Sequence, residues 1–118
     1  MLVGYARTST AEQAAGLEAQ RRDLAATGCT KLFVEQVSSV VERPQLTAAL
    51  DFVRDGDTLV ITRLDRLARS TSHLLSIVEE LDRKGVALRI LDFGGGVVDT
   101  KSPSGRMLLT VFAAMAEF

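Results

Sequence analysis

The sequence lacks the residues on which disulfide-bonded and metal-binding domains depend. Cys29 is its only cysteine and His73 its only histidine. One cysteine cannot form an internal disulfide, and one residue of each kind makes no recognisable metal cluster. We therefore predict a protein without an internal disulfide, without a metal and without a cofactor.

Long apolar runs and an excess of one charge are missing as well. No apolar run approaches the roughly 20 residues that span a bilayer, and the chain does not open on a signal peptide. Fourteen basic residues against fifteen acidic ones leave a net charge of -1. We expect a cytoplasmic protein with no membrane partner, and one that cannot hold DNA by phosphate attraction alone.

What is present fits one compact domain over residues 1–118. The chain is long enough to bury a core, and 47% of its residues are hydrophobic. Short apolar runs predict strands at 2–6, 31–37, 58–62 and 86–91, with a short edge strand at 97–98. Helical patterns lie between these runs. The alternation predicts an α/β fold with a mostly parallel central sheet of four to five strands and helices on both faces.

Four helices are expected from capping and periodicity. The first runs from the capping-box pair Thr10 and Gln13 to Thr27, before Gly28. The second runs from Pro44 to about 55–57 and the third covers 71–84. Their expected core-facing residues are Leu46, Ala49, Leu50 and Val53 in the second, and Leu74, Leu75, Val78 and Leu81 in the third.

The last helix, expected at 103–118, has an unusual pattern. Ser102 is its N-cap and Pro103 its first residue. From Met107 to Phe118 it is apolar nearly all round, which is too much for a helix with one core-facing stripe. It also lacks a C-cap, so we expect the helix to be truncated here and to continue in the natural protein. The apolar surface needs a second partner.

The segment after the first strand holds the first candidate site. In open parallel sheets the functional crevice lies at the carboxyl ends of the strands. Arg7 and Ser9 are two residues apart there, which places a cation and a nucleophile on one face if the extended backbone persists. The alternative is that Ser9 or Thr10 caps the following helix while Arg7 is a surface charge.

Two further segments at the same end of the sheet offer arginines. On a helical turn Arg66 and Arg69 are spaced i, i+3, and Asp65 lies four residues before Arg69, where its carboxylate can orient it. Arg43 precedes Pro44 after the second strand. The pattern predicts an anion site; the alternative is a solvated, salt-bridged start of a helix.

Four motifs together resemble one family. Residues 5–10 (YARTST), 42–46 (ERPQL), 63–69 (RLDRLAR) and 104–107 (SGRM) are similar in order and spacing to those of serine recombinases of the resolvase/invertase family. The resemblance implies a resolvase-like catalytic domain. It implies that Ser9 is the nucleophile, that Arg7, Arg43, Arg66 and Arg69 surround the scissile phosphate, that Asp65 supports the arginines, and that Gln13 and Gln20 lie at supporting positions near the substrate. Arg63, in the third motif, is a further candidate substrate contact.

The resemblance also implies a reaction and partners. Ser9 would attack DNA and form a covalent 5'-phosphoserine, and clustered guanidiniums would replace a metal ion in stabilising the phosphate. The partners would be DNA, bound specifically through a C-terminal domain absent from this chain, a second copy in a homodimer, and a tetramer in the synaptic complex. We expect only weak self-association of the 118 residues. The alternative is a non-catalytic dimerising or regulatory domain of the same fold.

Overall fold

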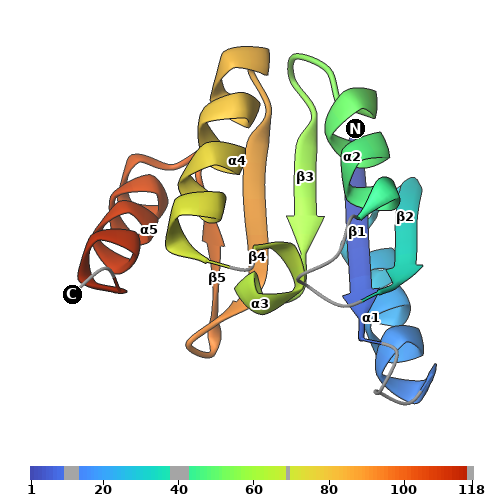
Figure 1. The fold of residues 1–118 in the computed structure, drawn as a ribbon. Coiled ribbons are helices and arrows are strands. Elements are labelled where there is room, and N and C mark those ends of the chain that lie inside the picture. The colour runs from blue at the N-terminus through green and yellow to red at the C-terminus, as the bar shows by residue number, and fades with distance from the viewer. Residues whose placement is uncertain (10–13, 38–42, 69, 117–118) are drawn as a thin grey trace.

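A computed structural model describes residues 1–9, 14–37, 43–68 and 70–116 of the chain. Strands and helices alternate along most of it (Figure 1). The strands are β1 (Leu2–Thr8), β2 (Lys31–Gln36), β3 (Thr58–Ile61), β4 (Ala87–Phe93) and β5 (Gly96–Asp99). The helices are α1 (Ala14–Thr27), α2 (Pro44–Phe52), α3 (Leu64–Leu67), α4 (Thr71–Lys84) and α5 (Pro103–Ala116). None of the described helices is both long and apolar enough to cross a membrane.

The five strands form one sheet in the order β2-β1-β3-β4-β5. β1 pairs with β2 and β3, and β3 pairs with β4, all in parallel. β5 runs antiparallel to β4 at the edge, after a turn in which Gly94 and Gly95 have positive φ. All four residues of β3 are buried, as expected for a central strand covered on both faces. The predicted α/β fold with a mostly parallel sheet is therefore confirmed.

Helices cover both faces of the sheet (Figure 1). On one face, residues of α2, α3, α4 and α5 join the strands in the larger apolar cluster, which includes Tyr5, Leu46, Leu67, Leu74 and Leu109. On the other face, Leu24 of α1 packs with Ala6 and Val60. Gly4 of β1 lies under α1, where an added Cβ would crowd Leu24 and Leu32. The first strand can approach α1 this closely because residue 4 has no side chain.

The helix predictions differ from the structure in detail. α4 has the predicted bounds, but Leu75 is exposed and Ile77 is buried in its place. Residues 74, 77 and 81 lie along one side of a helix, so their stripe excludes Leu75. α2 ends at Phe52, before the predicted 55–57, because Val53 adopts an extended backbone.

α5 begins as predicted and is only partly packed. The hydroxyl of Ser102 accepts the N–H of Gly105, as an N-cap does. A side chain on Gly105 would overlap the carbonyl oxygen of Asp99, so the start of α5 lies directly against the end of β5. Arg106 forms an ion pair with Asp82 of α4. Leu109 and Ala113 are buried, whereas five large apolar side chains are exposed: Met107, Leu108, Val111, Phe112 and Met115.

Candidate active site

The candidate site lies at the carboxyl edge of the parallel strands. Ser9 directly follows β1, Arg43 directly precedes α2, and α3 begins three residues after β3 ends. Because the three strands run parallel, the segments that leave them meet at one edge of the sheet. The fold thus gathers the three segments in which the sequence predicted an anion site.

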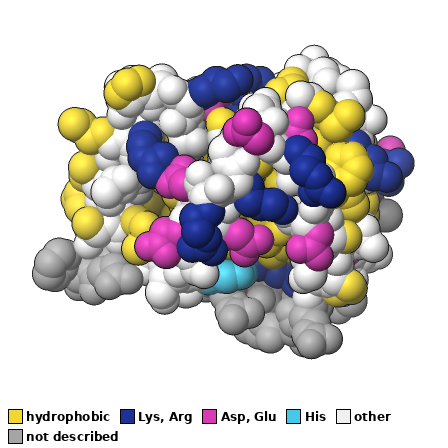
Figure 2. Space-filling model, turned by 90° about the horizontal axis from the view of Figure 1, so that it is seen from above, with side chains coloured by type: hydrophobic (Ala, Val, Ile, Leu, Met, Phe, Trp, Pro, Cys, Tyr) yellow, Lys and Arg dark blue, Asp and Glu magenta, His cyan; other side chains and the backbone are white. Residues whose placement is uncertain are grey.

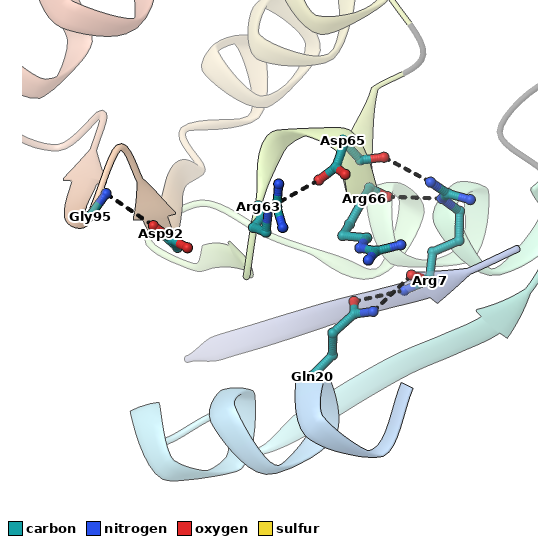
Figure 3. A network of polar contacts seen from close by, with 7 residues as sticks. All are labelled: Arg7, Gln20, Arg63, Asp65, Arg66, Asp92 and Gly95. Carbon is teal, nitrogen blue, oxygen red and sulfur yellow. Dashed lines mark hydrogen bonds and ion pairs between the residues drawn. The ribbon is translucent and has the colours of Figure 1, made fainter. Parts of the chain in front are cut away.

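Arg7 is a buried cation at this edge, with 5% of its surface exposed. Its Nη2 donates to the carbonyl of Asp65 at 2.8 Å and its Nε to that of Arg66 at 3.4 Å, as Figure 3 shows. Its Nη1 donates to the carbonyl of Val37 at 3.0 Å, beyond β2. The side chain therefore joins the ends of β1 and β2 to α3. The alternative that Arg7 is a surface charge is wrong.

Gln20 of α1 fixes the backbone of Arg7 from the other face of the sheet. Its side-chain oxygen accepts the N–H of Arg7 at 3.1 Å, and its side-chain nitrogen donates to the Arg7 carbonyl at 2.9 Å (Figure 3). The pairing of β1 with β3 ends at Gly4, so Arg7 lies beyond the part of β1 that pairs with β3. The side-chain amide of Gln20 supplies hydrogen bonds to the backbone there. Gln20 is itself buried. The geometry supports a positioning role for Gln20 in place of direct contact with a substrate.

Arg43 is the second buried cation, with 6% of its surface exposed. Its Nη1 donates to the carbonyl of Arg66 at 3.3 Å and its Nη2 to that of Leu67 at 2.6 Å. Arg7 and Arg43 therefore share the Arg66 carbonyl as an acceptor. Because both guanidiniums donate to this one oxygen, the two cationic groups are held side by side.

α3 is a short helix. Its four residues end at Leu67, and Ala68 has an extended backbone with φ -118 and ψ 145. The described helix ends at Leu67, and the helical spacing of Arg66 and Arg69 stays a prediction. The side chain of Arg66 extends from α3 toward β1 and lies beside Arg7 (Figure 3). Arg69 and Gln13, two of the predicted site residues, lie outside the described residues.

Asp65 contacts Arg7 through its backbone, and its predicted partner Arg69 lies outside the described residues. Its carbonyl accepts Arg7, while its carboxylate lies 3.6 Å from Nε of Arg63. Both side chains of this pair are 59% exposed, so the pair contributes little to stability. Figure 3 shows Arg63 on the side of Asp65 that faces away from Arg7. The carboxylate of Asp65 thus pairs with Arg63, and α3 holds Arg7 through its backbone.

Sequence reasoning missed two buried polar residues next to the arginines. Glu35 of β2 is 7% exposed, and its carboxylate accepts the hydroxyl of Tyr5 at 2.6 Å. Burial, and then the neighbouring Glu35 carboxylate, raise the pKa of the Tyr5 hydroxyl well above its ordinary value. The available signal was the alternation of β2, in which Glu35 occupies the same inward-facing set as the buried Phe33.

The opposite edge of the sheet has a different charge arrangement. Figure 2 shows basic and acidic side chains interleaved over that edge. The pairs there include Asp82 with Arg106, and Asp57 with the amino group of Met1. Their charges compensate one another. The two buried guanidiniums on the carboxyl edge donate to backbone carbonyls of α3 beside the strand end that leads to Ser9, which makes this edge the better candidate for binding an anion.

Comparison with known proteins places the chain in a family. Residues 2–118 match the family model described as "Resolvase, N terminal domain". The chain belongs to the resolvase family. This membership confirms the resemblance predicted from the four sequence motifs, and the roles of individual residues stay predictions.

Relatives within the resolvase family share much of this sequence. The chain is 43% identical to the serine recombinase gin of Escherichia phage Mu, over 99% of this chain and 58% of that protein. It is 41% identical to the transposon Tn552 DNA-invertase BinR of Staphylococcus aureus, over 100% of this chain and 60% of that protein. The chain thus spans about three-fifths of the length of these relatives.

A solved structure confirms the resolvase-family fold. The crystal structure of the N-terminal catalytic domain of TP901-1 integrase matches with a TM-score of 0.77. The match covers 99% of this chain and 94% of that one at 24% sequence identity, a level at which only the fold is comparable.

Proposed function

We propose that this resolvase-family domain cleaves and rejoins DNA strands in site-specific recombination. Ser9 is the nucleophile, and Arg7, Arg43 and Arg66, together with Arg69, bind the phosphate that it attacks. One observation carries the proposal: two buried guanidiniums, Arg7 and Arg43, converge on the carbonyl of Arg66 beside the strand end that leads to Ser9. The names of the relatives, a serine recombinase and a DNA-invertase, support it.

The proposed reaction exchanges one phosphoester for another. The Ser9 hydroxyl loses its proton as its oxygen attacks the phosphorus, and the bond from phosphorus to the 3' oxygen breaks. The 3' oxygen takes up a proton, and the 5' end of the DNA stays attached to Ser9. A free 3' hydroxyl can then reverse the reaction on the same or another strand, because the covalent intermediate conserves the phosphoester bond.

The arginines would stabilise the transition state, in which negative charge accumulates on the phosphate oxygens. Donors that are already oriented do not have to reorganise at the moment of reaction, and this is a large source of rate enhancement. The α3 carbonyls orient Arg7 and Arg43 in this way. A guanidinium has five N–H donors, so binding two carbonyls orients Arg43 without exhausting it. No described group of three or more His, Cys, Asp or Glu is placed to hold a metal ion.

The proposal is tested by isolating the covalent intermediate. DNA recognition by this domain alone is disfavoured by its net charge of -1, and we propose that base contacts come from a segment outside these 118 residues. The chain is therefore fused after residue 118 to a DNA-binding domain of known sequence preference and incubated with matching duplex DNA. We expect a protein–DNA adduct that survives denaturation, and peptide mapping should place a 5'-phosphate on Ser9. Attachment at another residue contradicts the mechanism, and bound DNA that is never cleaved favours the non-catalytic alternative.

The exposed face of α5 is our proposed surface for self-association. Apolar side chains gather on the side of the molecule where α5 lies (Figure 2). Leaving such side chains in water forgoes about 1.5 to 3 kcal/mol each relative to burial. We expect sedimentation to show weak self-association of the 118-residue chain, and Leu108→Glu to abolish it. The control Ala26→Glu adds the same charge to an exposed position of α1; equal behaviour of the two variants would exclude the α5 face.

A further inference from the structure

The start of α2 is capped in an unusual way. Helices usually begin after a Ser, Thr, Asp or Asn whose side chain accepts a backbone N–H of the first turn. The residue in that position is Arg43, which makes no side-chain cap hydrogen bond. An arginine has only donors and cannot accept one. The first-turn N–H groups of α2 therefore need another acceptor.

Glu35 supplies that acceptor from the neighbouring strand. Its Oε1 accepts the N–H of Gln45 at 3.2 Å, and its Oε2 accepts that of Leu46 at 3.1 Å. Pro44 has no N–H, and the N–H of Thr47 donates to the carbonyl of Arg43 at 3.1 Å within the helix. The carboxylate also lies where its charge is favoured, at the positive end of α2. The cap is complete without the side chain of Arg43.

Because Glu35 caps α2, the side chain of Arg43 is not needed at the start of this helix and can extend to other partners. A capping side chain folds back over the first turn of its own helix, whereas the Arg43 side chain extends to the carbonyls of Arg66 and Leu67. Tyr5 holds Glu35 in turn, by donating its hydroxyl to Oε2. Arg43 also lies close enough to this hydroxyl to lower its pKa, against the larger opposing effects of burial and Glu35. Tyr5, Glu35 and Arg43 thus form one buried cluster that joins β1, β2 and α2.

We propose that Glu35, held by Tyr5, is a positioning residue that caps α2 in place of Arg43 and so fixes the Arg43 guanidinium in the anion site. Neither residue needs to touch the DNA, because Glu35 is buried and Tyr5 is fully buried. The catalytic part of this inference rests on the function proposed above. The positioning part stands on the geometry alone.

The positioning is tested in the 118-residue chain without DNA. In Glu35→Gln an NH2 group replaces one of the two acceptor oxygens. At the Oε1 position it cannot accept the N–H of Gln45, and at the Oε2 position it cannot accept the N–H of Leu46 or the hydroxyl of Tyr5. We expect nuclear magnetic resonance to show slow rotation of the Arg43 guanidinium in the wild type, because both Nη atoms are held, and faster rotation in Glu35→Gln. Tyr5→Phe keeps the ring and both helix-cap bonds, so it should show a smaller change in a folded chain. Unchanged Arg43 signals in both variants would overturn the proposal.

The catalytic consequence is tested with the fusion protein. Misplacing a catalytic group by about 1 Å can cost about 100-fold in rate, so we expect Glu35→Gln to slow adduct formation by up to about 100-fold. If Glu35 acts through Arg43, the variant should add little to the loss already caused by Arg43→Ala, because residues that act through one another are not additive. Full additivity of the two losses would show that Glu35 acts independently of Arg43.

A control separates positioning from general destabilisation. Asp99 is also a partly buried carboxylate that binds an arginine, Arg89, and a backbone N–H, that of Lys101, but it lies at the junction of β5 and α5. Asp99→Asn should lower the thermal stability without changing the rate of adduct formation. If the wild-type fusion makes no adduct at all, the proposed function fails, while the Arg43 signals still decide the positioning. A Glu35→Gln fusion as fast as the wild type would overturn the catalytic role.

Discussion

Replacing Ser9 by alanine should abolish covalent attachment to DNA while leaving the domain folded. In the proposed reaction the hydroxyl oxygen forms the bond to phosphorus, and loss of a catalytic serine costs on the order of 10⁶ in rate in a well-studied hydrolase. Ser9 is only partly buried, so its hydroxyl contributes little packing. We expect the free energy of unfolding to change by less than about 1 kcal/mol. Adduct formation on denaturing gels and urea unfolding measure the two effects.

The matched control for Ser9→Ala is Ser76→Ala. Ser76 is an exposed serine on α4, so its loss should change neither stability nor adduct formation. Adduct that persists in Ser9→Ala at the wild-type rate would remove Ser9 from the reaction and require another nucleophile.

Replacing Arg7 by lysine should have the second largest effect on cleavage. Arg7 binds three carbonyls in three directions through Nε, Nη1 and Nη2, and a lysine has a single nitrogen on a flexible stem. Removing one preorganised donor from an oxyanion site typically costs about 10² to 10³ in rate, and we expect a loss of this size in single-turnover cleavage. The positive charge is kept, so a loss would be due to the geometry of the guanidinium.

Arg7→Lys should also lower the stability of the domain, because the Arg7 side chain joins β1, β2 and α3. We expect Arg7→Lys to lower the free energy of unfolding by about 1 to 3 kcal/mol, as loss of hydrogen bonds from a buried charged group does. The variant should still be folded at 25 °C, which circular dichroism can verify. Arg83→Lys, at an exposed position of α4, is the matched control and should behave as the wild type. Cleavage by Arg7→Lys within about threefold of the wild type would place the anion site elsewhere, since the expected loss is far larger.

Much of the fold could be predicted because its signals are local. The apolar run 58–62 and the glycine after Thr27 specify a strand and a helix end without reference to the rest of the chain, and both agree with the structure. The exposure of Leu75 could not be predicted in the same way. The apolar residues of α4 allow two overlapping core-facing stripes, one with Leu75 and one with Ile77. Packing against the other elements determines which stripe faces the sheet.

The convergence of Arg7 and Arg43 was predictable from the sequence, and their contacts were predictable only in part. The order of the strands brings Arg7 and Arg43 together, as expected from parallel strands that end at one edge. Their acceptors are backbone carbonyls, which every residue has, so the sequence does not indicate which residues provide them. The role of Glu35 was equally hidden, because capping from a neighbouring strand depends on the register between elements ten residues apart.

The backbone acceptors of Arg7 and Arg43 bear on how freely this site can change in evolution. A substitution at Asp65 replaces a side chain and leaves its carbonyl in place, so it does not remove the acceptor of Arg7. The acceptor of Arg43 at Leu67 is likewise a backbone atom. Proline is the exception, because it alters the backbone path of a short helix. Lineages can therefore diversify the surface of α3 while inheriting the same placement of two cations, and a randomised library at position 65 should retain many variants with that placement intact.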